Sequence, residues 1–300
     1  MFLNGTNSLR SAALASRILA ASSFKNLQKL LYFIHRMKKF LTIVKAFWQR
    51  ALTYRFTVLA YRIGEIGETL ALILMWSAIY GGQKVIGGLT LQEMITYILV
   101  GNFFNAIIRN FLSSVVSHDI KDGRLSMFLI RPMSYFNYIL SREIGRISLS
   151  TLMSVLSSML IIIFFINTFI WNFDVAYFLI IVAMVILAFV VELFLSYLIG
   201  LISFWTDEVD GIYATIDRIK KFFSGGYFPI NLLPLMFVQV SFALPFAYSF
   251  FVPAQLYLKK LDLSVGLKGL LIQIVWILIL YGIIKIVWGR GLKRYEGVGT

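Results

Sequence analysis

The sequence predicts an all-α integral membrane protein. We expect six transmembrane helices, preceded by an N-terminal amphipathic interfacial helix, with outer re-entrant helices between the fifth and sixth spans. Apolar residues make up 59% of the 300 residues, charged residues only 14%, and the mean hydropathy is +0.83. Soluble domains contain roughly 45–50% apolar and about 25% charged residues, and much of their surface must meet water. This composition therefore excludes a soluble domain and predicts a multi-pass membrane protein.

Six apolar stretches approach the length of about 20 residues that a helix needs to cross a hydrocarbon core of about 30 Å. They cover residues 63–80, 94–116, 147–170 and 175–204, a broken stretch from residue 211 past residue 226, and residues 267–288. Four tryptophans lie near the ends of these stretches, as interfacial aromatic residues do: Trp76, Trp171, Trp205 and Trp288.

Lysine and arginine are concentrated in alternate connections between the stretches. The segment before the first stretch, the connection after the second and the C-terminal tail are basic, whereas the connections after the first and third carry little positive charge. The cytoplasmic loop after the fourth is moderately basic, with Arg218, Lys220 and Lys221 beside Asp207, Glu208, Asp210 and Asp217. By the positive-inside rule, we expect the inner membrane, with both termini cytoplasmic. Lys259 and Lys260 are exceptions, because this topology puts them outside. Topology accounts for the net charge of +14, and nucleic acid is not needed as a partner.

The segment between the fifth and sixth stretches is apolar but interrupted by helix breakers. These are Gly225, Gly226, Pro229, Pro234, Pro245 and Pro253. Prolines at this density end or kink helices, and irregular backbone at membrane depth needs cover from protein or water. We therefore expect short re-entrant or interfacial helices over residues 228–252 on the outer side. The alternative is one kinked span, which would put the basic tail outside.

The N-terminal region before the first span has two parts. Residues 1–36 form an extension that is rich in Ser, Ala and Leu and lacks acidic residues, so it is either a targeting segment or, as we favour, an upstream extension before Met37. Residues 40–56 predict an amphipathic helix on the inner membrane surface, with its basic face towards anionic head groups. A simple basic anchor for topology fits this segment equally well. The apolar face consists of Phe40, Ile43, Val44, Phe47, Ala51 and Tyr54.

No catalytic constellation is found in the sequence. It lacks cysteine, a His-Glu-x-x-His pair, a Gly-x-Ser-x-Gly elbow and a phosphate-binding Gly-x-x-x-x-Gly-Lys-Ser/Thr loop. We therefore predict no catalytic residue, no cofactor-binding residue and no metal site. Any use of ATP requires a partner protein.

Polar residues inside the spans are candidates for function, because charge in hydrocarbon is costly and usually serves a purpose. Arg62 and Glu65 are three residues apart and are expected to pair on one helix face. Glu192 and Arg109 are candidates for a proton relay, and a satisfied buried pair is the structural alternative for each residue. The intramembrane candidates are Glu65, Glu68, Asn102, Asn105, Arg109 and Glu192.

The basic connection after the second span contains a compact motif. A charged turn around Gly123 is followed by an apolar face of Leu125, Phe128 and Leu129, which Arg131 and Pro132 end. Such a short amphipathic helix can dock in a groove of a soluble partner, although a plain interfacial loop helix is the alternative. The candidate docking residues are Lys121, Asp122, Gly123, Arg124, Leu125, Phe128, Leu129, Arg131 and Pro132.

In this order along a six-span chain, four features resemble the permease subunit of an ABC transporter of the type-two exporter class. The resemblance covers residues 37–300. The features are the amphipathic basic helix, the loop Asp122-Gly123-Arg124-Leu125 to Arg131-Pro132-Met133-Ser134, the outer segment Gly225-Gly226-Tyr227-Phe228-Pro229 to Leu244-Pro245-Phe246, and the tail from Gly289 to Gly297. The family pattern does not require residues 1–36.

The resemblance implies a half-transporter without enzymatic activity of its own. Two such permeases, identical or related, would enclose the translocation path, and separate cytoplasmic ATPase subunits would bind ATP and Mg. Residues 121–132 would be the coupling helix, residues 40–56 the connecting helix, and the outer segment a cap over the path. The cargo, the direction of transport and the choice between homodimer and heterodimer stay open. The competing hypothesis is a secondary transporter driven by an ion gradient; an intramembrane enzyme is disfavoured by the missing catalytic residues.

Overall fold

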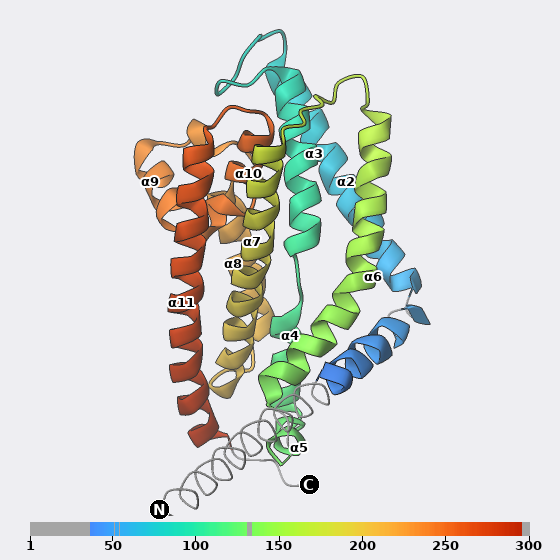
Figure 1. Cartoon of the computed structure of the whole chain (residues 1–300), viewed down its shortest axis with the longest axis vertical. Helices are drawn as coiled ribbons and strands as arrows, with labels where there is room; N and C mark the ends of the chain where they lie inside the picture. The colour runs from blue at the N-terminus through green and yellow to red at the C-terminus, as the bar shows by residue number, and fades with distance from the viewer. Residues whose placement is uncertain (1–36, 51, 54, 131–133, 296–300) are drawn as a thin grey trace, which may run out of the picture.

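The computed structural model describes residues 37–50, 52–53, 55–130 and 134–295 (Figure 1). Within these ranges the regular structure is helical, and the only extended pairing is an isolated bridge between Ile86 and Leu89. The predicted N-terminal extension, residues 1–36, lies outside the described residues. Ala51, Tyr54, Arg131 and Pro132 lie outside them too.

Five stretches of the described chain are long and apolar enough to cross a membrane. They are Arg62–Tyr80, Leu91–Lys121, Tyr135–Phe164, Val175–Phe204 and Leu263–Arg294. They contain most of the long helices: α2 (Arg55–Tyr80), α3 (Leu91–Ile108), α4 (Leu112–Lys121), α6 (Tyr135–Phe164), α7 (Val175–Leu201) and α11 (Leu263–Arg294). The predicted class, a helical multi-pass membrane protein, agrees with this finding.

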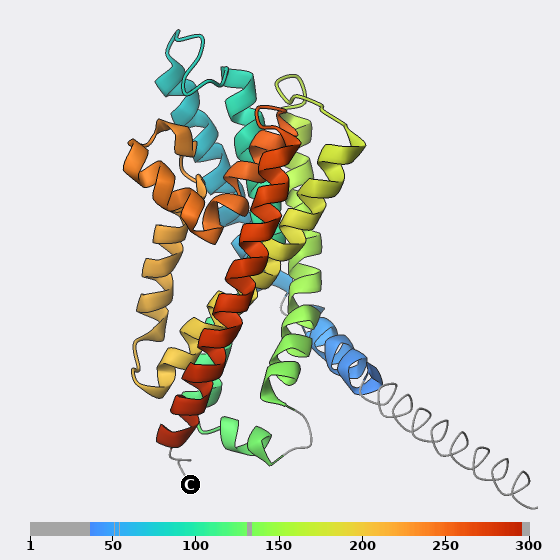
Figure 2. The same ribbon diagram turned by 60° about the vertical axis from the view of Figure 1, so that its left-hand side comes forward.

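The long helices run side by side along the long axis of the molecule (Figures 1 and 2). The connections at residues 81–90, 165–174 and 258–262 lie at the upper end in both views. The α4–α6 connection, the turn after α7 and the C-terminal end of α11 lie at the lower end. Successive traverses therefore run in alternate directions, as the distribution of loop charge requires.

The second predicted span is not one continuous helix. α3 ends at Ile108, Arg109 has an extended backbone with φ −62° and ψ 132°, and α4 begins at Leu112. Side chains from three other helices satisfy the backbone around this break. The Phe111 amide donates to Glu143 (3.3 Å), the Ser113 amide to Ser196 (3.1 Å), and the Tyr213 hydroxyl to the Asn110 carbonyl (3.1 Å). A gap in a membrane helix is tolerated where neighbours replace the lost hydrogen bonds in this way.

α8 (Val209–Ser224) takes the place of the first half of the predicted fifth span. Lys220 and Lys221, which the charge pattern assigned to a cytoplasmic loop, belong to this helix and face the interior of the bundle. That loop assignment was wrong, because the sequence does not show that acidic partners lie on other helices. The helix ends at Gly225, whose φ of +83° and close approach to the Tyr97 hydroxyl leave no room for a side chain.

Four short segments follow Gly225 in the upper half of the molecule (Figure 1). They are η2 (Ile230–Leu232), α9 (Leu235–Ala243), η3 (Pro245–Tyr248) and α10 (Phe251–Tyr257). The expected short helices over residues 228–252 are thus present as elements. α9 and the following η3–α10 segment are bent by 73° and pass the length and apolarity test for a span only as a pair. The prolines at 234 and 245 precede or open these helices, where a missing N–H costs little.

The two outer lysines have acidic partners at the upper end of the bundle. Lys259 lies 3.3 Å from Asp174, and Lys260 lies 2.7 Å from Glu93. The hydrogen bond from Lys259 lowers the pKa of the Asp174 carboxyl below its ordinary value. Because each of these lysines is paired with an acidic residue, the two are compatible with the topology that the charges of the other loops predict.

Candidate functional site

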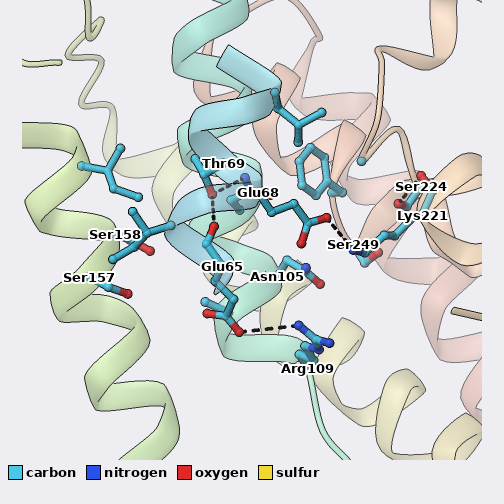
Figure 3. Close-up of a pocket in the computed structure, with 17 residues that line it drawn as sticks. Glu65, Glu68, Thr69, Asn105, Arg109, Ser157, Ser158, Lys221, Ser224 and Ser249 are labelled. Carbon is cyan, nitrogen blue, oxygen red and sulfur yellow. Dashed lines mark hydrogen bonds and ion pairs between the residues drawn. The ribbon is translucent and has the colours of Figure 1, made fainter. Parts of the chain in front are cut away.

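A polar cleft lies between α2, α3, α6 and α8 and is also lined by Ser249 and Phe250, just before α10 (Figure 3). Five of the six intramembrane candidates line it: Glu65, Glu68, Asn102, Asn105 and Arg109. The sixth, Glu192, lines an adjoining cavity that shares Asn105 and Arg109 with the first. The structure thus brings together residues that lie far apart in the sequence.

Glu65 joins two helices through one carboxylate. Its two oxygens lie 2.5 Å from the Arg62 guanidinium and 3.5 Å from the Arg109 guanidinium. The predicted Arg62–Glu65 pair is therefore confirmed. Arg62 also donates to Ser154 and Ser150 on α6, so that α2, α3 and α6 meet at this carboxylate. Arg109 reaches it from the end of α3, because the helix break turns the chain there.

A second ion pair crosses the cleft between α2 and α8. Lys221 lies 2.7 Å from Glu68, whose side chain is 47% exposed (Figure 3). The sequence analysis singled out Glu68 but not Lys221, which stands in a charged run that reads as a loop. Only the position of its partner identifies it as a cleft residue.

The adjoining cavity contains an ion pair in which both partners are enclosed. Lys220 lies 2.6 Å from Glu192 and 3.4 Å from Asp217, and the side chains of Lys220 and Glu192 are only 11% and 12% exposed. Glu192 and Arg109, the candidates for a proton relay, both line this cavity, and each has a different ion-pair partner. Burial of both partners makes this pair costly to break.

The remaining polar groups of the cleft are uncharged. Asn102 donates to Thr69 (3.0 Å), and Ser157 and Ser158 of α6 line the cleft on the side away from Asn105 (Figure 3). Every charged group described above already has a partner of opposite sign. The uncharged side chains of the cleft are therefore the groups that can offer hydrogen bonds to a polar molecule. In the part of the chain that the structure describes, no cluster of His, Asp and Glu has the arrangement of a metal site.

The predicted docking motif lies at the lower end and contains α5 (Leu125–Leu129). Its expected apolar face divides into two sets. Leu125 is buried, and the Phe128 ring packs against Tyr138 with centroids 4.3 Å apart, so these two residues hold the motif to the bundle. Met127, Leu129 and Ile130 face outward instead, and Ile130 is 87% exposed. Of the predicted face of Leu125, Phe128 and Leu129, only Leu129 is exposed, because a five-residue helix is too short for its periodicity to define one face.

A buried carboxylate fixes the start of α5. Asp119 is 2% exposed, accepts a hydrogen bond from the Tyr135 hydroxyl (3.1 Å), and lies 3.6 Å from Arg142 and 3.8 Å from Arg124. The other predicted motif residues have local roles: Lys121 donates to the Asp207 carbonyl, Asp122 pairs with Arg124, and Gly123 adopts φ +71°. Arg131 and Pro132 lie outside the described residues.

A bundle of apolar helices around a polar cleft, with an anchored apolar motif at one end, is the architecture of the membrane component of a transporter. The chain belongs to the ABC-2 family of transporter proteins, since the model of this family matches residues 66–299, more than three quarters of its length. A search of curated proteins found no match to this chain. The predicted resemblance is confirmed: the protein is a multi-pass permease component, and the family is not itself catalytic.

Proposed function

We propose that the protein is the transmembrane subunit of an ATP-driven exporter, forming the translocation path as a dimer and working with a separate ATPase subunit that binds ATP and Mg. Family membership supports the ABC class, and the polar cleft supports a path for a polar group of the cargo. The six spans are α2, α3 with α4, α6, α7, α8 with the re-entrant α9–α10 segment, and α11. Both termini are then cytoplasmic, in the inner membrane, and the amphipathic N-terminal helix lies on its inner surface.

The observation that supports coupling to an ATPase is the exposed apolar surface formed by α5 and the residue after it. Three exposed apolar residues, Met127, Leu129 and Ile130, lie at the lower end of the molecule, where α11 also ends (Figure 1). They lie outside the stretches that are apolar enough to cross a membrane. Exposed apolar residues on a rigid support are typical of a protein–protein contact. Asp119 and its two arginines supply that support. The docking surface proposed here therefore consists of Met127, Leu129 and Ile130 with the charged turn at residues 121–124.

Ile130→Asp is expected to weaken binding of the ATPase subunit by at least about tenfold, since the loss of an apolar anchor in an interface costs more than about 1.4 kcal/mol. The 87% exposed side chain has little packing to lose, so membrane insertion and folding stay intact. Co-purification of the ATPase with the tagged permease, and transport-linked ATP hydrolysis after reconstitution, measure the effect.

Val85→Asp is the matched control, because Val85 is also exposed and apolar but lies in the connection at the upper end. Leu125→Asp is unsuitable, since it would disturb the packing of the bundle. An ATPase that binds Ile130→Asp as well as the unchanged protein would contradict the docking assignment. A tagged permease that carries no ATPase at all would contradict the ABC mechanism.

Single-cysteine labelling is expected to give opposite results at the two ends. The chain has no native cysteine, so Val85→Cys and Ile130→Cys each introduce one unique thiol. In intact cells, a membrane-impermeant maleimide should label position 85, and position 130 only after permeabilisation. The reverse pattern would refute cytoplasmic termini, and labelling of both positions in intact cells would refute opposite locations.

The buried Glu192–Lys220–Asp217 cluster favours one second candidate, a carrier driven by an ion gradient. A carboxylate enclosed with a lysine is the kind of group that exchanges protons during transport. Transport that continues after ATP depletion, stops when the gradient is collapsed, and is lost in Glu192→Gln would support this alternative over the exporter.

A further inference from the structure

The helix at residues 37–50 uses its predicted apolar face to contact protein. Val44 and Phe47 pack on α6 at Gly145, where an added Cβ would lie 2.4 Å from the Val44 carbonyl and 3.0 Å from the Phe47 Cβ. Phe40 and Ile43 of the same face are half-buried. This close approach of two backbones, permitted by a glycine, fixes the helix to the lower part of α6, beside the bundle (Figure 2).

Another side of the same helix has no partner among the described residues. Met37, Leu41 and Trp48, together with Leu52 just beyond, are exposed and lie at 4- and 7-residue spacings, which put them on one stripe. Lys38 and Lys45 are exposed beside this stripe, and residues 37–50 contain no acidic residue. A stripe of Leu and Trp flanked by lysines is the composition of a helix in the head-group region of an anionic leaflet.

Arg142 of α6 connects this helix to the docking motif. Its guanidinium lies over the Phe47 ring, 5.3 Å from the centroid, and also lies 3.6 Å from Asp119. Asp119 in turn lies 3.8 Å from Arg124, which immediately precedes α5. Each contact joins a different element, so the sequence of contacts runs from the N-terminal helix through α6 and α4 to α5.

We propose that the exposed stripe of the 37–50 helix binds anionic phospholipid head groups of the inner leaflet, and that Arg142 makes the position of α5 depend on this binding. Lipid binding does not depend on the proposed function; only its consequence for the ATPase does. The positive charge of this face favours a lipid surface over a second copy of the chain as its binding partner. A second copy of this face would bring lysines against lysines, whereas an anionic leaflet attracts them and accepts the apolar stripe.

Lipid binding is tested with the full chain carrying Leu41→Cys and an environment-sensitive fluorophore. In nanodiscs, adding phosphatidylglycerol to phosphatidylcholine should shift the emission to the blue, and high salt should reverse the shift. Replacing Lys38 and Lys45 by Gln should lower the ratio of bound to unbound helix roughly thirtyfold, since each lysine near an anionic leaflet contributes about 1 kcal/mol. Lys268→Gln, at an exposed lysine near the other end of the bundle, is the control that should leave the label unchanged.

The role of Arg142 is tested by the distance between spin labels at Leu41→Cys and Ile130→Cys. Phosphatidylglycerol should narrow the distribution of distances in the unchanged protein. Arg142→Gln should abolish the narrowing, because the variant loses the contacts that join the 37–50 helix to Asp119. The fluorescence response at position 41 should persist, because Arg142 is not part of the stripe that binds lipid. Arg142→Lys keeps the charge next to Asp119 but loses the planar contact with Phe47, and should restore the narrowing in part.

Two results would overturn the proposal. If the emission of the label at position 41 does not change with phosphatidylglycerol or salt, the stripe does not bind anionic lipid. Cross-linking between two copies through position 41 would then identify the stripe as a dimer contact. A distance distribution that still narrows in Arg142→Gln would remove Arg142 from the connection. Either result leaves the ATPase test at Ile130 unaffected, so the two proposals fail separately.

Discussion

Lys220→Met is expected to lower the free energy of unfolding by about 3–5 kcal/mol, the cost of leaving a buried charge without its partner. Glu192 is 12% exposed and lies 2.6 Å from the Lys220 ammonium. Methionine nearly preserves the volume but leaves the carboxylate without its counter-charge in a low-dielectric environment. Unfolding in mixed micelles, followed by tryptophan fluorescence, measures the change.

Lys221→Met is the control that the chain itself provides. Lys221 is the next residue of the same helix and makes an ion pair of similar length, 2.7 Å, with Glu68. Glu68 is 47% exposed, so water replaces the lost partner and the expected cost is below about 1 kcal/mol. Combining Lys220→Met with Glu192→Gln should recover much of the stability. Equal losses for the two lysine variants would contradict the burial difference between the pairs.

Gly200→Ala is expected to destabilise the protein by about 1–3 kcal/mol through overpacking. A Cβ at Gly200 of α7 would lie 2.6 Å from the Val116 Cβ and 2.9 Å from the Ser113 carbonyl oxygen of α4. Neither atom is the free end of a flexible side chain, so the two helices must separate. The hydrogen bond from the Ser113 amide to Ser196 is stretched at the same time.

Gly282→Ala makes the same chemical change with the opposite expected sign. Gly282 lies in the interior of α11, and nothing lies within 4 Å of an added Cβ. Alanine should stabilise this helix by up to about 1 kcal/mol, because glycine has the greater conformational freedom to lose. Thermal unfolding of the two variants in one detergent compares them. A neutral Gly200→Ala would mean that α4 does not pack against α7 as closely as described.

The sequence was sufficient for those features whose causes are local. Apolar length identified most spans, alternating charge predicted that successive traverses run in alternate directions, and the prolines after Gly226 predicted the short helices of residues 228–252. The predicted fifth stretch, however, ran past Gly225, where α8 ends. The spacing of Arg62 and Glu65 was enough to predict their pairing, because one turn of helix brings them together.

Features that depend on contacts between residues far apart in the sequence could not be predicted in this way. The break at residues 109–111 has no proline or glycine; its supports, Glu143, Ser196 and Tyr213, lie on three other helices. Lys220 was assigned to a loop because its burial depends on Glu192, 28 residues earlier in the chain. A polar stripe predicts that residues share a helix face but does not specify their partners.

The unequal lengths of α3 and α6 have a consequence for how a cargo reaches the cleft. At 1.5 Å per residue, the 18 residues of α3 measure about 27 Å and the 30 residues of α6 about 45 Å. α6 alone is therefore longer than a hydrocarbon core of about 30 Å, whereas the second traverse reaches the lower end only with α4 added to α3 (Figure 1). Arg109, at the break between them, lies in the lower half of that traverse. Under the proposed topology, a molecule from the cytoplasm meets the Glu65–Arg109 pair before it has crossed the upper half of the span.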